Sequence, residues 1–263
     1  MENERMPLIE HLGELRKRIT ISLTALLIAF MVAFNYSEEL FRSIMFPLKY
    51  NLSFSMENPF ISIIPQEKLS QTTKLVFLAP AEAFWMSMKV SFVAALVLAL
   101  PVIFHQLWKF ISPGLLVREK KYVFPFVISA TGLFVAGALF CFFMVLPFAM
   151  GFLLTYKLGD VLMPMLSVGL YVDFCLKFIL AFGAVFELPI VIIFLARMGI
   201  VTAKTLAKNR KYAVLAAFIL AAILTPTPDI FNQTLMAIPI IILYEVGILV
   251  SRIFVRGKTT DAS

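Results

Sequence analysis

The chain has 263 residues, of which 61% are hydrophobic, and it carries a formal net charge of +7. Its mean hydropathy of +0.93 lies far outside the range of soluble domains, so the lipid bilayer is expected to be its main solvent. The basic residues stand beside long apolar runs and are not interleaved with aromatic residues, and we therefore expect no nucleic-acid partner.

Six apolar runs predict six transmembrane helices. They centre on residues 19–36, 82–104, 122–147, 171–196, 212–224 and 233–250. Most are long enough to cross a hydrocarbon layer about 30 Å thick at about 1.5 Å per helical residue. The last two helices are expected to be short, because the fifth run extends over only about 20 Å. The predicted fold is an all-α integral membrane protein with a single six-helix domain over residues 1–263.

Lysine and arginine residues predict the orientation of these helices. They gather before the first run, between the second and third, between the fourth and fifth, and after the sixth. The residues are Arg5, Arg16, Lys17, Arg18, Lys109, Arg118, Lys120, Lys121, Arg197, Lys204, Lys208, Arg210, Lys211, Arg252, Arg256 and Lys258. Because basic loops stay on the cytoplasmic side, both termini are predicted to face the cytoplasm.

The segment before the first run, residues 1–18, is predicted to be a cytoplasmic amphipathic helix along the membrane interface. Its apolar residues recur at helical spacing, as at Leu8, Leu12 and Leu15. The alternative is that these residues are only the charged start of the first membrane helix. In either case Glu14 can reach Arg18 one helical turn later.

The longest connection, residues 37–81, is predicted to be an ordered external cap, since long loops are usually functional or disordered. Its apolar groups at residues 46–48 and 60–64 favour a short packed or interfacial helix. The loop over residues 105–121 and the tail over residues 251–263 are predicted to be cytoplasmic. In that loop, Ser112-Pro113-Gly114 predicts a turn before the third helix.

Prolines in or at the ends of the helices predict bends, because proline lacks an N–H and its ring clashes with the preceding turn. These prolines are Pro101, Pro125, Pro147, Pro189 and Pro239. Bent helices can enclose a concave face. In the third run, Gly132, Ala136 and Gly137 are small residues at a spacing that lets neighbouring backbones approach closely in lipid.

Glu187 is the residue that the bilayer tolerates least. It lies deep in the fourth run, where inserting a carboxylate into the membrane costs a few kcal/mol of free energy. An ionisable group at this depth is therefore taken to have a function unless a structural role explains it. The structural alternative is a neutral Glu that is hydrogen-bonded to a neighbouring helix. Between the last two runs, Thr227 is a candidate N-cap, with Pro228 at the first helical position and Asp229 at the positive helix end.

Four motifs, in this order along nearly the whole chain, resemble TatC of the twin-arginine protein translocase. They are His11-Leu12-Gly13-Glu14-Leu15-Arg16-Lys17-Arg18, then Phe110-Ile111-Ser112-Pro113-Gly114-Leu115 running to Glu119, then Phe186-Glu187-Leu188-Pro189, then Leu224-Thr225-Pro226-Thr227-Pro228-Asp229 with Gln233 and Ala237-Ile238-Pro239. Each motif is weak alone. Four of them, placed correctly on six predicted helices, make a specific match.

The resemblance implies a receptor in the bacterial cytoplasmic (inner) membrane that binds signal peptides with two adjacent arginines. It further implies assembly with the single-helix proteins TatA and TatB and with other copies of itself, to move folded proteins by means of the proton-motive force. The implied signal-peptide site contains Glu14, Glu119 and Phe110, together with three residues of the same motifs, Arg16, Pro113 and Gly114. A carboxylate accepts a planar guanidinium bidentately, which Lys cannot copy, so two acids can select an arginine pair.

The resemblance also assigns residues outside that site. Glu187 matches the membrane-embedded acid of the family and is expected to contact a partner helix or an inserted signal peptide, since helix pairs in lipid gain from shared hydrogen bonds. Thr225, Asp229 and Gln233 match a partner-docking edge, and Pro47 matches a position that shapes the external cap.

Other classes of function stay open at this point. A proton-coupled secondary transporter would use Glu187 as its intramembrane proton site, but it should show inverted repeats, and residues 1–121 and 122–263 show no convincing repeat. An intramembrane enzyme would need a His-Glu-x-x-His, Gly-x-Ser-x-Gly or paired-Asp motif, and none is present. A six-helix scaffold without a transport role is the third alternative. We expect no catalytic residue, no cofactor and no metal site.

Overall fold

The computed structural model describes residues 8–54, 61–65, 74–111, 123–155, 165–225 and 229–256. Most of these residues are helical. Five helical segments among them are long and apolar enough to cross a membrane, namely Leu12–Asn35, Glu82–Ile111, Val123–Leu153, Val168–Arg197 and Ile230–Ile253. The prediction of a mostly helical membrane protein is therefore confirmed.

In chain order the elements are α1 (Leu8–Asn35), α2 (Ser37–Ile44), α3 (Phe46–Lys49), β1 (Tyr50–Phe54), β2 (Ile61–Pro65), β3 (Lys74–Val76), α5 (Glu82–Ile111), α6 (Val123–Phe140), the π-helical turn η3 (Cys141–Val145), α7 (Leu146–Thr155), β4 (Met165–Ser167), α8 (Val168–Phe186), α9 (Leu188–Arg197), α10 (Ala203–Lys208), α11 (Arg210–Leu224) and α12 (Ile230–Arg256). They form two compact units. One contains Met1–Arg42 and Ala83–Gly132, and the other contains Ser43–Glu82 and Leu133–Ser263.

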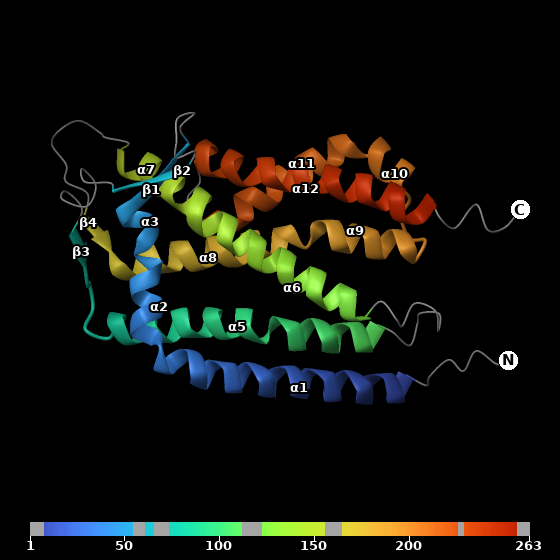
Figure 1. Ribbon diagram of the computed structural model, residues 1–263, viewed down its shortest axis with the longest axis horizontal. Helices are drawn as coiled ribbons and strands as arrows, with labels where there is room; N and C mark the ends of the chain where they lie inside the picture. Colours follow the sequence, from blue (N-terminus) through green and yellow to red (C-terminus); the bar gives the residue numbers. More distant parts are fainter. Residues whose placement is uncertain are drawn as a thin grey trace, which may run out of the picture. The chain divides into compact units, whose positions relative to one another are not determined.

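In the first unit, α1 and α5 lie side by side (Figure 1). α1 is one continuous helix of 28 residues, so the part of the amphipathic segment that the structure describes runs into the first membrane helix without a break. Thr20 and Thr24 lie within α1, and each hydroxyl donates to the carbonyl oxygen four residues earlier, at 2.8 and 2.9 Å. These bonds satisfy the hydroxyls inside the helix itself. Trp108 on α5 packs against Phe126 on α6, with ring centroids 4.4 Å apart.

In the second unit, the connection before α5 contains strands as well as helices. The short helix predicted at residues 46–48 is confirmed as α3, and Pro47 lies in its first turn, where no backbone N–H is needed. The prediction of a helix at residues 60–64 is wrong for residues 61–64, while Phe60 lies outside the described residues. β-Branched residues there form β2, which pairs antiparallel with β1 in the register Tyr50↔Pro65 and Phe54↔Ile61.

A second pair of strands joins two distant connections of the same unit. β3 runs parallel to β4, with Lys74 opposite Met165 and Val76 opposite Ser167. The prediction of a purely α-helical fold is therefore corrected by two small two-stranded sheets. Each sheet lets backbone groups between membrane helices pair with each other, which a helix cannot do over so few residues.

Glu82, at the start of α5, fastens the connection that contains β3 to the start of α8. Its Oε2 accepts hydrogen bonds from the backbone N–H groups of Leu78 at 2.6 Å and Ala79 at 3.3 Å. Its Oε1 accepts from Ser167 Oγ at 2.8 Å and from the N–H of Gly169 at 2.6 Å. A carboxylate at this helix N-terminus also complements the positive end of the helix dipole. A Cβ on Gly169 would meet Glu82 Oε1 at 2.5 Å, so the arrangement requires glycine there.

The third and fourth membrane spans are interrupted close to their prolines. In the third, η3 lies between α6 and α7, and the N–H of Leu146 bonds to the carbonyl of Cys141, just before Pro147. In the fourth, Glu187 separates α8 from α9, and Pro189 lies in the first turn of α9. Proline supplies no N–H to continue the regular ladder, which explains both interruptions.

The last two helices differ in length, so the prediction that both are short is only half right. α11 has 15 residues and extends over about 22 Å, whereas α12 has 27 residues. Pro239 lies inside α12 without ending it, because one proline removes only one bond of the ladder. α12 lies alongside α9 and α11 in the second unit (Figure 1). Arg210, at the start of α11, pairs with Glu245 on α12 at 2.7 Å.

Gly137 lies at a close contact between α6 and α8. A Cβ at this position would lie 2.6 Å from the carbonyl oxygen of Phe182 and 2.6 Å from the ring of Phe186. At Gly132, one and a half turns earlier, a Cβ would meet no described atom within 4 Å. The expectation that small residues on this helix admit a neighbouring backbone therefore holds at Gly137 and not at Gly132.

We predict that Gly137→Ala destabilises the protein by about 1–3 kcal/mol, the usual result of overpacking. Gly132→Ala is the matched control on the same helix and is expected to leave stability unchanged or slightly raised, since Ala is the better helix former. The measurement is the melting temperature of each detergent-solubilised variant. Equal melting temperatures for the two variants would contradict the close contact at Gly137.

Candidate functional site

Glu14 and Arg18 form an ion pair near the start of α1, as the sequence predicted. Arg18 Nη2 lies 2.8 Å from Glu14 Oε1. The side chains of Arg18 and Glu14 are only 21% and 19% exposed, respectively. Water therefore screens this pair less than a pair on an open surface.

A second helix contributes to the same guanidinium. Arg18 Nη1 donates to Gln106 Oε1 on α5 at 3.3 Å, and Gln106 is only 8% exposed. The Nε atom of Arg18 is also buried, and it has no hydrogen-bond partner among the described residues. One guanidinium thus bridges a carboxylate on α1 and an amide oxygen on α5.

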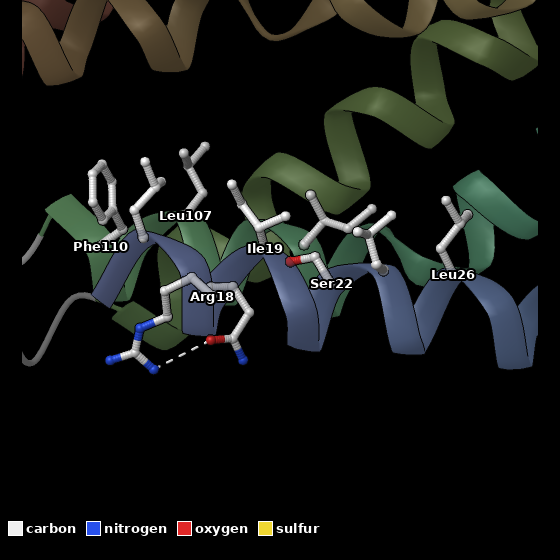
Figure 2. A pocket seen from close by; sticks show the side chains of 10 residues that line it. Arg18, Ile19, Ser22, Leu26, Leu107 and Phe110 are labelled. Carbon is white, nitrogen blue, oxygen red and sulfur yellow. Dashed lines mark hydrogen bonds between the residues drawn. The ribbon is translucent and has the colours of Figure 1, made fainter. Parts of the chain in front are cut away.

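A pocket of about 350 Å³ lies between α1 and α5. Its lining residues are Leu15, Arg18, Ile19, Ser22, Leu23, Leu26, Ile103, Gln106, Leu107 and Phe110. Figure 2 shows the bond from Arg18 to Gln106 toward the end where Phe110 lies, with Leu26 toward the other end. The pocket therefore combines a polar end, which can hold a guanidinium, with a long apolar wall.

The other predicted members of this site differ in what the structure says of them. Phe110 lies in the pocket. Arg16 is exposed on α1 and is not among the residues that line the pocket, although its carbonyl accepts from Thr20. Pro113, Gly114 and Glu119 lie outside the residues that the structure describes.

Glu187 occupies the break between α8 and α9. Its N–H bonds to the carbonyl of Ala184 at 3.1 Å, and its carbonyl accepts from Val191 at 3.0 Å. Its side-chain Oε1 is buried and has no hydrogen-bond partner in the part of the chain that the structure describes. The alternative in which a neighbouring helix satisfies this oxygen is not seen there. A buried acceptor without a partner is costly in a membrane interior and suits a donor from another molecule.

Thr225, Asp229 and Gln233 lie together at the α11–α12 hairpin, and each makes a bond within it. Thr225 Oγ1 donates to the carbonyl of Ala221 at 2.8 Å, and Gln233 Nε2 donates to the carbonyl of Phe218 at 3.1 Å. The three residues therefore stabilise the hairpin, whatever else they contact.

Asp229 caps α12, a role that the sequence analysis gave to Thr227. Asp229 Oδ1 accepts from the N–H of Asn232 at 2.7 Å, the bond of an N-cap residue. The helix starts at Ile230, so Asp229 holds the capping position, and Thr227 falls outside the described residues. Pro47, predicted to shape the cap, is fully buried in α3.

Two polar side chains that connect distant parts of the chain, Gln106 and Glu82, were not singled out from the sequence. Gln106 lies in the apolar stretch leading to Phe110, and an uncharged amide there carries little signal beyond its cost in lipid. Glu82 follows Pro80 at the start of an apolar run, which resembles an ordinary helix start. Among the described residues, no group of three or more His, Cys, Asp or Glu side chains is arranged to hold a metal ion.

Comparison with known proteins gives one consistent family. The family described as Sec-independent protein translocase protein (TatC) matches residues 10–239. The TatC protein of Carboxydothermus hydrogenoformans is 41% identical over 258 residues, which are 98% of this chain and 97% of that protein. The TatC protein of Aquifex aeolicus is 38% identical over 254 residues, or 96% of this chain and 98% of that one.

The fold agrees with the sequence comparison. A crystal structure of a twin-arginine translocase receptor, TatC, matches with a TM-score of 0.76 and 36% identity, and covers 92% of this chain and 98% of that one. Since sequence and fold match over nearly the full length, the chain belongs to the TatC family of Sec-independent protein translocase proteins.

Proposed function

We propose that this chain is the twin-arginine signal-peptide receptor and core subunit of a Tat translocase, which moves folded proteins across the membrane by means of the proton-motive force. The observation that carries the proposal is the partly buried Glu14 carboxylate, which already binds a guanidinium. A carboxylate held in this way at the start of the first membrane helix has the chemistry needed to bind arginine.

The proposed signal-peptide site combines the two acids Glu14 and Glu119 with Phe110. Phe110 lines the same pocket as Arg18, the partner of Glu14, which supports placing it beside the bound peptide. Pro113 and Gly114 are proposed to shape the loop that carries Glu119, and Arg16 to lie at the rim of the site. Two carboxylates that each bind a planar guanidinium would favour arginine over lysine.

The proposed topology has six spans in a single domain, with both termini in the cytoplasm and the protein in the bacterial inner membrane. Five described spans and the shorter α11 support six, because a short helix can cross where the bilayer thins. The interruptions at η3 and Glu187 support bent helices that enclose a concave face.

The proposed partners are twin-arginine signal peptides, the single-helix subunits TatA and TatB, other copies of this chain, and the lipid bilayer. Glu187 is proposed to receive a hydrogen bond from a partner helix or an inserted signal peptide, because its Oε1 is buried without a described partner. The hairpin with Thr225, Asp229 and Gln233 is the proposed docking edge, and Pro47 is proposed to shape the cap. No observation favours a secondary transporter over this role, and we propose no catalytic activity.

We predict that Glu14→Gln and Glu119→Gln each weaken binding of a twin-arginine signal peptide by about tenfold, since a hydrogen bond to a charged group contributes about 1.5–3 kcal/mol. A peptide with Lys-Lys in place of Arg-Arg should bind wild type no better than Arg-Arg binds these variants. The measurement is the dissociation constant of each signal peptide from the purified protein. Glu38→Gln is the control, because this side chain is 85% exposed on α2. Equal binding in every combination would remove the receptor proposal.

We predict that Glu187→Gln retains most transport activity, whereas Glu187→Leu loses it, because Gln keeps an oxygen acceptor of similar size. The measurement is export of a folded reporter that carries a twin-arginine signal peptide, at matched levels of the two variants in the membrane. If Leu supports export as well as Gln does, the side-chain oxygen of Glu187 has no role in partner contact.

A further inference from the structure

The carboxylate proposed to bind the signal peptide is already occupied by this chain's own arginine. Arg18 donates from Nη2 to Glu14 on α1, and from Nη1 to Gln106 on α5, the bond drawn in Figure 2. Separate nitrogens of one guanidinium therefore reach acceptors on two helices. Both acceptors and Arg18 belong to the first compact unit. The arrangement has the form of a bound ligand, although the ligand is part of the protein.

We infer that Glu14 and Gln106 form a seat for one arginine side chain, which Arg18 fills in the free protein and an arginine of the signal peptide takes over on binding. The inference rests on the proposed function and deepens it. It adds Gln106 as a residue that recognises the peptide and makes Arg18 the internal competitor. The two acceptors are called the guanidinium seat below.

The seat favours a guanidinium for a geometric reason. Arg offers several N–H groups in a rigid plane, so each acceptor receives its own nitrogen, whereas Lys must serve both acceptors from a single nitrogen. Gln106 is nearly buried, and a buried amide oxygen without a donor is unfavourable. The seat is therefore expected to hold a guanidinium for most of the time.

Arg18 is suited to leave the seat. Its bond to Glu14 joins residues four apart on one helix, so losing this bond separates no two elements of the fold. Its buried Nε has no hydrogen-bond partner among the described residues, so the seat does not satisfy Arg18 fully. Its side chain is already 21% exposed, and a long arginine side chain can carry its charge outward to water or lipid headgroups.

Internal competition has a defined thermodynamic consequence. It lowers the apparent affinity for every ligand by the fraction of time that the seat is vacant, and by the same factor for each ligand. Loss of Arg18 should therefore tighten binding of Arg-Arg and Lys-Lys peptides equally and leave their ratio unchanged. Loss of Gln106 weakens the binding of Arg18 to the seat as well as the binding of the peptide. The two changes partly cancel, so the effect of losing Gln106 on peptide affinity is masked while Arg18 is present.

The first test compares Arg18→Gln with Lys17→Gln in the full-length purified protein, with a twin-arginine signal peptide as the probe. Both variants lose one positive charge at neighbouring positions, but Lys17 is exposed and no described pair holds it in the seat. We expect about three- to tenfold tighter binding for Arg18→Gln, seen in the association rate, and less than about twofold change for Lys17→Gln. Arg18→Lys, which keeps the charge, is expected to fall between wild type and Arg18→Gln.

The second test places Gln106→Leu in two backgrounds, because Leu keeps the side-chain volume and removes the acceptor. We expect it to weaken binding by about fivefold in Arg18→Gln and by less than about twofold when Arg18 is present. A residue that only positions Arg18 would have no effect once Arg18 is gone. The inference is overturned if Arg18→Gln binds no tighter than Lys17→Gln, or if Gln106→Leu has no effect in Arg18→Gln.

A third variant separates this inference from the proposed function. Glu14→Gln in the Arg18→Gln background should weaken binding by more than the roughly tenfold expected when Arg18 is present, since no competitor then masks part of the loss. If binding is unchanged in this double variant, Glu14 does not bind the peptide. Both the proposed signal-peptide site and the guanidinium seat are then wrong. If binding weakens there while the first two tests show no effect of Arg18 or Gln106, only the seat fails.

Discussion

The fold depends on one constraint, that a polar group in the hydrocarbon layer must find its partner within the protein because no water is there to provide one. Hydroxyls of Thr20 and Thr24 bond back to their own helix, and Gln233 donates to a carbonyl of the adjacent α11. At the start of α5, where the span meets the connection before it, Glu82 likewise shares its two oxygens among four donors. Each of these bonds also connects two helical turns or two elements. The hydrogen bonds that satisfy the polar groups therefore also stabilise the fold.

The positions where the described residues leave this constraint unmet are the functional candidates. Oε1 of Glu187 is buried without a described partner at a helix break, where Pro189 has already removed one backbone bond. Nε of Arg18, beside the pocket between α1 and α5, is likewise buried without a hydrogen-bond partner among the described residues. In lipid such atoms are unfavourable, and a binding partner that satisfies them gains more than it would in water. The free energy that these unpaired atoms cost the free protein is thus recovered when a partner binds to them.

Arg18 and Glu14 illustrate how a receptor for a basic peptide can itself be basic. The chain carries +7, and several cations surround the proposed site, which would repel an arginine pair if all were free. The ion pair with Glu14 neutralises Arg18 locally, and the bond to Gln106 fixes where its charge lies. A visiting guanidinium that replaces Arg18 would leave the charge balance of the seat unchanged, whereas it would meet net repulsion elsewhere on this surface.

The sequence alone determined the membrane class, the first four long spans and the short fifth run, because hydrophobic length is a local property, whereas the sixth run was predicted to be short and forms the 27-residue helix α12. It also determined the Glu14–Arg18 pair, since residues four apart on a helix are neighbours whatever surrounds them. Tertiary structure decided the partners that lie far apart in the chain. Gln106 joined the pair only because α5 lies beside α1, Gly137 was distinguished from Gly132 only by the backbone of α8, and residues 61–65 became a strand only because β1 offered a partner. Non-local contacts of this kind depend on how the elements assemble, and no local pattern of residues encodes them by itself.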